Sequence, residues 1–261
     1  MASLKVYGDH LSPYLTIVKL VLAEKGIDFQ LVPISLFKAE QKTPEFLKLN
    51  PWGKVPVMED EDGPNGKPLV LAESRAISIY LAKKYWDTGT PLMPDPSDPA
   101  ATGRFNEAML AEALYIDTPA IEVAVEKLIK LSRGLALNEV ALNALRATLK
   151  TNFAVVDRIL ATRPYIAGDE YGLVDIFYTP SIHLLERSGE KDVMEGLEHL
   201  ASWWAKVKSR KQTAHVTAEA HAAFDELMAM TKTANGTGEG DKTGASSKLQ
   251  LPCESEDVCN Y

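Results

Sequence analysis

The chain has 261 residues, and 46% of them are hydrophobic, which is enough to bury the core of one large domain or two small ones. The formal net charge of −8 argues against general binding to nucleic acid or to an anionic membrane, because both favour a surplus of lysine and arginine. The two cysteines, Cys253 and Cys259, lie near the C-terminus. Neither a disulfide framework nor a cysteine nucleophile in the core is therefore expected.

The sequence also lacks the features of a membrane or metal protein. The most apolar early segment, Leu15–Ala23, contains Lys19 and is too short to span a bilayer, and the residues before it do not form a secretory signal. We therefore expect a soluble protein of the cytoplasm that makes no membrane contact. We expect no bound metal, because the histidines show no ligand spacing with cysteines or carboxylates. These histidines are His10, His183, His199, His215 and His221.

Residues 1–86 alternate strand and helix patterns. Leu4–Tyr7 alternates as a strand does, and Ser12 followed by Pro13 is a strong start signal for a helix over Tyr14–Lys25. The order of the expected elements predicts a small α/β domain of the thioredoxin type. The later elements are a strand over 29–34, a helix over 45–49, strands over 57–60 and 69–71, and a helix over 75–84.

The second part of the chain differs in composition and in the spacing of its apolar residues. Residues 87–99 are rich in proline, glycine and aspartate, as expected of a linker between domains. From 100 to 230 apolar residues recur at helical spacing, most clearly over Leu142–Leu160, so we expect an all-helical domain there. Residues 231–261 are rich in threonine, glycine, serine and lysine, and we predict a disordered tail because they cannot bury enough apolar surface.

The stretch Asn50–Ile77 has the pattern of a peptide-binding margin. Pro56 has no backbone N–H and holds Val55 in an extended conformation, so the amide and carbonyl of Val55 are available to another backbone. If the bond between them is cis, a short peptide could pair there as an added strand. Ser74 is a good helix cap, and the helix N-terminus behind it favours a carboxylate or phosphate. A purely structural proline turn and a routine cap are the alternative interpretation.

Taken together, the motifs resemble those of a glutathione transferase, and within that superfamily they are most similar to the phi class of plants and fungi. The resemblance covers Leu4 to Met230. It implies a thioredoxin-like domain followed by a helical domain, usually in a homodimer. The implied reaction is conjugation of glutathione to small hydrophobic electrophiles in detoxification, with reduction of organic hydroperoxides as a second activity. Glutathione is then a co-substrate, and no cofactor is implied. The motifs are Ser12, Glu40-Gln41-Lys42, Asn50-Pro51-Trp52-Gly53-Lys54-Val55-Pro56, Glu73-Ser74-Arg75-Ala76-Ile77, Gly168 with Asp175, and Trp203-Trp204.

The resemblance assigns the cysteinyl backbone and the γ-glutamyl end of glutathione to separate residues. Val55, followed by Pro56, would pair with the cysteinyl backbone. Glu73 and Ser74 would hold the γ-glutamyl end, and Arg75 beside them would favour a carboxylate.

The glycyl carboxylate and the thiol have their own implied partners. Lys42, Lys54 and Gln41 would face the carboxylate. Ser12 would donate a hydrogen bond to the thiolate and, with the helix N-terminus, lower the thiol pKa. Leu11, Phe37 and Tyr115 are candidate apolar linings for the second substrate, and the alternative interpretation is that they are ordinary core or interface residues.

Several alternatives stay open from the sequence. Ser12 could be a helix cap only, and Tyr7 or Tyr14 could replace it, because other classes of the superfamily use a tyrosine hydroxyl. The chain could also be a non-catalytic protein that binds glutathione and apolar ligands, or a regulatory module on the same fold.

Three positions depart from the phi pattern. Ile17 stands where arginine is common, and Lys54 stands where glutamine is common. Gly172 replaces the serine or threonine that usually caps the helix with the buried aspartate, so we expect weaker support for folding at that helix.

Overall fold

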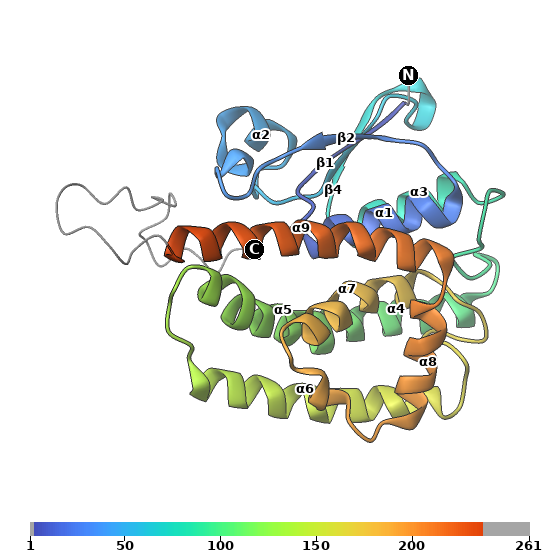
Figure 1. Cartoon of the computed structure of the whole chain (residues 1–261). Helices are drawn as coiled ribbons and strands as arrows, with labels where there is room; N and C mark the ends of the chain where they lie inside the picture. The colour runs from blue at the N-terminus through green and yellow to red at the C-terminus, as the bar shows by residue number, and fades with distance from the viewer. Residues whose placement is uncertain (1–2, 237–261) are drawn as a thin grey trace. The chain divides into compact units, whose positions relative to one another are not determined.

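A computed structural model describes residues 3–236, which form two compact units. Within this range the first unit consists of residues 3–15, 28–74 and 218–236, and the second of residues 16–27 and 75–217. Figure 1 shows the elements of both units. Helix α1 (Pro13–Lys25) and helix α9 (Lys211–Gly236) each contribute residues to both.

The first unit is built on a four-stranded sheet with the order β2-β1-β3-β4. Strand β1 (Leu4–Gly8) pairs in parallel with β2 (Gln30–Pro33), with Gly8 opposite Pro33. It pairs antiparallel with β3 (Val57–Asp60), and β3 pairs antiparallel with β4 (Leu69–Ala72). This mixed sheet (Figure 1) confirms the α/β prediction for the N-terminal part of the chain.

Helix α2 (Pro44–Leu49) contributes to the core of the first unit. It begins at the cap Thr43, whose hydroxyl oxygen accepts a hydrogen bond from the Phe46 amide at 3.4 Å. Phe46 packs with Val55 and Val57, which are both buried. Partly buried residues packed against these three are Tyr7, Ile34, Leu36, Leu49 and Ala72.

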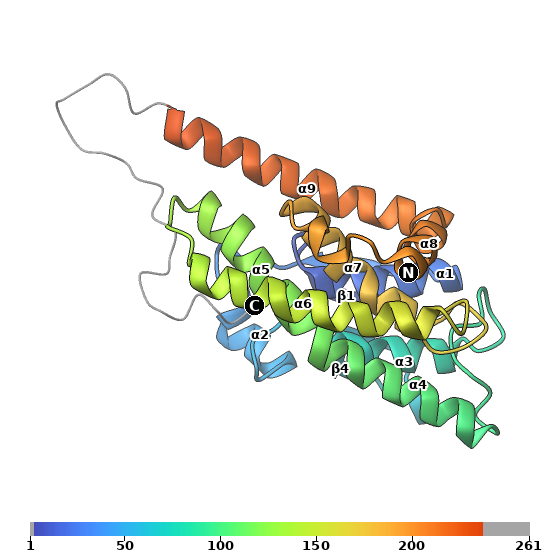
Figure 2. The same ribbon diagram turned by 90° about the horizontal axis from the view of Figure 1, so that it is seen from below.

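The second unit is helical, which confirms the prediction for the C-terminal part. Its central helix is α7 (Leu173–Arg187), which is buried from Leu173 to Leu185 and contacts α4, α5 and α8 (Figure 2). An apolar run of this length is stable as a helix only when neighbours cover every side of it. The remaining helices are α3 (Ser74–Lys84), α4 (Pro99–Ala111), α5 (Thr118–Ala124), α6 (Glu139–Leu160) and α8 (Glu198–Lys208).

Two π-helical segments, η3 (Glu112–Asp117) and η4 (Val125–Lys130), flank α5. Regular helical spacing did not predict them. In η3 the hydroxyl of Thr118 donates to the carbonyl of Ala113 at 3.2 Å. The Asn152 amide from α6 donates to the carbonyl of Tyr115 at 2.7 Å. Side chains thus donate hydrogen bonds to backbone carbonyls at the point where the α-helical pattern is interrupted.

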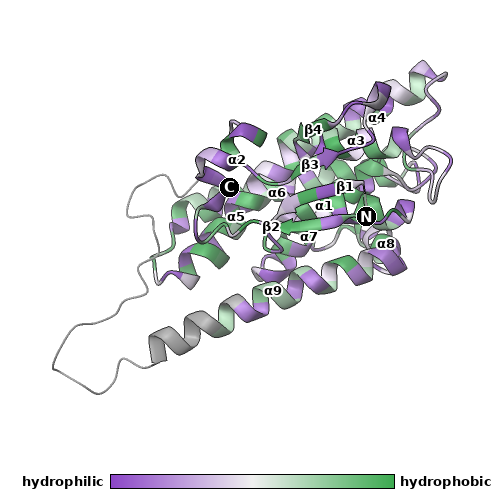
Figure 3. Cartoon of the chain, turned by 90° about the horizontal axis from the view of Figure 1, so that it is seen from above, coloured by the Kyte–Doolittle hydropathy of each residue, from purple (hydrophilic) through white to green (hydrophobic). Residues whose placement is uncertain are grey.

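The C-terminal helices differ from the sequence prediction. Helix α8 ends at Lys208, and α9 begins at Lys211 and continues to Gly236, so residues 231–236 are helical although we expected the tail to start at 231. Alanine and methionine before this point favour continuation of the helix. Figure 3 shows polar and apolar residues alternating along α9, which buries Val216 and Phe224. The rest of the expected tail, with Cys253 and Cys259, lies outside the described residues.

Within residues 3–236, none of the helices combines the length and apolar character needed to cross a bilayer.

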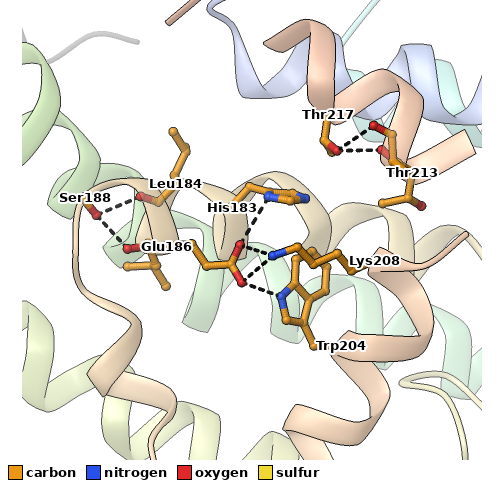
Figure 4. A network of polar contacts seen from close by, with 10 residues as sticks. His183, Leu184, Glu186, Ser188, Trp204, Lys208, Thr213 and Thr217 are labelled. Carbon is orange, nitrogen blue, oxygen red and sulfur yellow. Dashed lines mark hydrogen bonds and ion pairs between the residues drawn. The ribbon is translucent and has the colours of Figure 1, made fainter. Parts of the chain in front are cut away.

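A polar network ties α7 to α8 (Figure 4). Glu186 Oε1 accepts a hydrogen bond from the Trp204 indole at 2.9 Å, and Oε2 accepts one from Lys208 Nζ at 2.8 Å. His183 Nδ1 lies 3.5 Å from the same Oε2. Burial opposes ionisation of Glu186, but hydrogen bonds from His183, Lys208 and Trp204 outweigh it and lower the pKa to about 2.

We expect Glu186→Gln to flatten the acid limb of the stability curve. The folded pKa of about 2 lies below the ordinary glutamate value of 4.5, so this carboxylate stabilises the fold above about pH 4.5 and loses that contribution as the pH falls toward 2. Because the side chain is partly exposed, the loss above pH 5 should be roughly 1–2 kcal/mol. Urea unfolding between pH 3 and 7 measures it. The exposed Glu107, changed to Gln, is the control, and equal effects of both changes would contradict the prediction.

Candidate functional site

The predicted site residues of the first unit gather at one end of its sheet. In the pairing register Tyr7 lies opposite Val57 and Val57 opposite Ala72, while Gly8 lies opposite Pro33. Strands β1, β2 and β4 therefore end at the edge where β3 begins. The segments attached at this edge are residues 9–12, 34–43, 53–56 and 73–74.

The margin at Val55 has unused backbone groups. The Val55–Pro56 peptide bond is cis, and the Val55 side chain packs into the core of the unit. Within the described part of the chain, neither the amide nor the carbonyl of Val55 makes a hydrogen bond. Because unpaired backbone groups are costly when they are buried, this margin is suited to pairing with another backbone.

Asn50 holds the turn before this margin. Its side-chain amide donates to the Lys54 carbonyl at 2.8 Å, and its Oδ1 accepts from the Trp52 amide at 3.1 Å. Gly53 has φ of +59°, and a Cβ there would lie 2.9 Å from the carbonyl oxygen of Gln41. Sequence reasoning did not assign Asn50 a role. Its signal is an asparagine before a proline-containing turn that ends in glycine.

A cationic region adjoins the turn. Lys42 Nζ donates to the Trp52 carbonyl at 3.3 Å. Burial lowers the pKa of Lys54, the neighbouring charge of Lys42 lowers it further, and Glu73 opposes both. Two ammonium groups that repel each other are stabilised by an anion between them, so this part of the edge is suited to a carboxylate.

The opposite part of the edge is the junction between β4 and α3. Glu73 has φ of +70°, a left-handed conformation that is unusual for glutamate and costs about 1–3 kcal/mol. Ser74 is buried and is the first residue of α3. A strained residue at a helix start is often maintained by a functional constraint.

Arg75 has partners that the sequence did not predict. We expected it beside the ligand, but its guanidinium donates from Nε and Nη2 to Glu112 Oε2, at 2.9 and 2.6 Å, and Nη2 lies 3.2 Å from Asp117 Oδ2. Glu112 is fully buried, and burial raises its pKa to about 7 even though Arg75 works against that rise. Arg75 therefore has two carboxylate partners inside the second unit.

Ser12 lies at the start of α1, directly beyond the end of β1. It is buried, and its Oγ accepts a hydrogen bond from the Leu15 amide at 3.4 Å. The cap uses a lone pair of the oxygen, whereas stabilising an anion uses the hydroxyl hydrogen. Capping and anion stabilisation are thus compatible roles for the same residue.

The two tyrosine alternatives differ from Ser12. The hydroxyl of Tyr7 donates to Glu59 Oε2 at 2.9 Å, and burial and then Glu59 raise the Tyr7 pKa. A tyrosine hydroxyl held by a carboxylate is a poor donor to a second anion. Tyr14 lies two residues after Ser12, in the first turn of α1, and is half-buried.

The residues predicted for an apolar pocket fall into two groups. Leu11 and Phe37 are half-buried in the first unit, in the segments that follow β1 and β2. Tyr115 belongs to the second unit, within η3, and is 58% exposed. The structure therefore places the first two at the same edge of the sheet.

The departures at Ile17 and Gly172 have physical explanations. Ile17 is fully buried in α1, where an arginine would need a charged partner. A Cβ at Gly172 would lie 2.9 Å from the Leu92 carbonyl oxygen, so serine does not fit there. Asp175 accepts from the Gly172 amide at 2.9 Å and thus supports the helix start itself.

The chain is similar in sequence and in structure to proteins of one family. Models of the glutathione S-transferase N-terminal and C-terminal domains match residues 11–84 and 139–205. Glutathione S-transferase PM239X14 from Arabidopsis thaliana is 37% identical over 206 residues, which cover 78% of this chain and 91% of that protein. Glutathione S-transferase hmp2 from Hypomyces subiculosus is 35% identical over 218 residues, with 83% and 99% covered. The structure of glutathione S-transferase I from mais in complex with the atrazine glutathione conjugate has a TM-score of 0.76 and 28% identity, with 84% and 99% covered.

Proposed function

Because the chain belongs to the glutathione S-transferase family, with the phi-class resemblance confirmed, we propose that the sheet edge of its first unit binds glutathione and activates its thiol. The enzyme is a glutathione transferase. The acceptors we propose are small hydrophobic electrophiles, and the proposed role is detoxification. Reduction of organic hydroperoxides is the proposed second activity, because a stabilised thiolate attacks oxygen as well as carbon.

The unpaired backbone of Val55 is the observation that supports this proposal most strongly. The cysteinyl backbone of glutathione pairs with it as a short added strand. The γ-glutamyl end lies at Glu73 and Ser74, and the glycyl carboxylate lies at Lys42 and Lys54. Charge on the ligand then matches charge on the edge at each end, with Gln41 and Pro56 completing the contact surface.

Ser12 supplies the chemical step. A thiol with a pKa of about 8.5 is roughly 3% ionised at pH 7, and lowering the pKa by about two units makes it mostly thiolate. That change corresponds to about 2.7 kcal/mol. A charge-assisted hydrogen bond from the Ser12 hydroxyl and the N-terminus of α1 together supply it. Leu11 and Phe37 hold the electrophile against the thiolate.

We expect Lys54→Met to raise the KM for glutathione about 10-fold with kcat changed less than about 2-fold, because one charged hydrogen bond to the glycyl carboxylate is lost. With the glycyl amide of glutathione, in which a neutral amide replaces that carboxylate, the same change should have little effect on KM. Steady-state kinetics with both thiols measures the difference. Lys48→Met, which removes an exposed lysine of α2, is the matched control. An equal rise in KM for both thiols would remove Lys54 from the glycyl site.

A non-catalytic protein that binds glutathione is the competing function. Retention on immobilised glutathione tests binding, and assays with chloro-dinitrobenzene and cumene hydroperoxide test the two activities. Retention without turnover of either compound would support the binding protein and contradict the enzyme. A regulatory module would show neither turnover nor a response of the thiol to Ser12.

We also propose a cytoplasmic homodimer without a bound cofactor. Its support is the pair of apolar side chains Leu110 and Leu114 of the second unit, which lie four positions apart and are each more than half exposed. The cytosol supplies reduced glutathione. Light scattering coupled to size-exclusion chromatography distinguishes a dimer from a monomer.

A further inference from the structure

We propose that Asp9 is a positioning residue that holds Ser12 in place relative to the segment after β2; the proposal rests on the proposed function. Asp9 Oδ1 accepts a hydrogen bond from the Leu11 amide at 2.9 Å. Its Oδ2 accepts one from the Leu36 amide, also at 2.9 Å. Its backbone carbonyl accepts a third from the Ser12 amide at 2.9 Å. One residue therefore bonds to both segments and to the catalytic serine itself.

The topology explains why such a link is needed. Strands β1 and β2 are parallel neighbours, so residues 9–12 and residues 34–43 leave the sheet side by side at the same edge. At their bases they are joined by the hydrogen bond from the Ile34 amide to the Gly8 carbonyl, at 3.0 Å. Beyond that point the Asp9 carboxylate joins them. Loops held only at their bases vary in separation, whereas one carboxylate with an oxygen on each loop fixes it.

The link connects groups with different tasks. On one side are Leu11 and the Ser12 hydroxyl, which acts on the sulfur. On the other side are Phe37, next to Leu36, and Lys42 further along the same segment. Asp9 thereby sets the separation between the group that activates the thiol and the wall against which the electrophile is held. A shift of about 1 Å between such groups can lower turnover about 100-fold.

Two effects of the Asp9 carboxylate on the thiol have opposite signs. As a negative charge near a thiolate it disfavours ionisation, so removing the charge should lower the thiol pKa. As a link that positions Ser12 it favours ionisation, so removing the link should raise the thiol pKa. The sign of the shift in an Asp9 variant therefore distinguishes positioning from simple electrostatics.

The test compares Asp9→Ala and Asp9→Asn with wild type, by the ultraviolet absorbance of the bound thiolate and by the pH profile of kcat/KM for chloro-dinitrobenzene. We expect Asp9→Ala to raise the thiol pKa by about one unit and to lower kcat about 10–100-fold, with the KM for glutathione changed less than about 3-fold. Asp9→Asn keeps one acceptor oxygen and should give a smaller rise. An unchanged or lowered thiol pKa in the variants would overturn the proposal.

Glu40→Gln is the matched control. Glu40 Oε2 accepts from the Ser35 amide at 2.7 Å, so it braces the same segment but makes no bond to residues 9–12. The thiol pKa of this variant should equal that of wild type, and a rise as large as that of Asp9→Ala would overturn the proposal. If Asp9→Ala does not fold, Asp9→Asn decides by the sign of its shift. Failure of the proposed function would look different, because Ser12→Ala would then leave the thiol pKa unchanged as well.

Discussion

Ser12→Ala is expected to lower kcat/KM with chloro-dinitrobenzene by about 10²–10³-fold, the usual effect of removing one donor to a reacting anion. The bound thiol should lose its hydrogen bond at the sulfur, and its pKa should rise toward the free value of about 8.5. The pH profile of kcat/KM measures the first effect, and the ultraviolet absorbance of bound thiolate measures the second. Because the helix N-terminus remains, the shift should be smaller than the full two units.

Controls separate this effect from loss of the helix cap. Removal of a serine cap lowers the free energy of unfolding by about 1 kcal/mol, so stability is measured in parallel. Ser12→Thr keeps a hydroxyl and should recover much of the activity. Tyr7→Phe should leave the thiol pKa unchanged, because that hydroxyl donates to Glu59. A loss of activity in Tyr7→Phe equal to that in Ser12→Ala would make tyrosine the activating residue.

Asp175→Ala is expected to have the largest effect on stability, a loss of about 3–5 kcal/mol in the free energy of unfolding. The Asp175 side chain is fully buried. It accepts from the Ile166 amide at 3.1 Å, the Gly172 amide at 2.9 Å and the Trp203 indole at 2.7 Å. Removing the carboxylate leaves these buried donors without their acceptor, and each such donor is costly in a dry core.

Urea unfolding at neutral pH measures this change. Trp203→Phe removes one of the three donors and keeps the carboxylate, so it should cost less than Asp175→Ala. The exposed Asp192, changed to Ala, is the control for loss of an aspartate from the same unit. If Asp175→Ala were no more destabilising than Asp192→Ala, the bonds at the start of α7 would not hold the second unit together.

Local chemistry explains why most elements were predictable. Ser12-Pro13, Thr43-Pro44 and Asp98-Pro99 mark the starts of α1, α2 and α4, and the structure begins these helices at the prolines. A cap and a fixed φ act within one helical turn, so a few consecutive residues of the sequence are enough to predict the helix start. The π-helical segment η3 was missed for the opposite reason, since one of its carbonyls is bonded by a side chain from another helix, Asn152.

The features of the candidate site also fall into those that the sequence predicts and those that depend on the tertiary structure. The sequence by itself determined the segments that meet at the sheet edge, because Pro56 removes a donor beside Val55 and Ser74 starts a helix, and both effects are local. Their assignment to glutathione stays a prediction. The tertiary structure alone decided the partners of Arg75, the need for glycine at 172 beside Leu92, and the link that Asp9 makes to Leu36. Arg75 and Glu112 are 37 positions apart, and Asp9 and Leu36 are 27 apart. Contacts over such separations depend on how the strands and helices pack, which residue spacing along the chain does not encode.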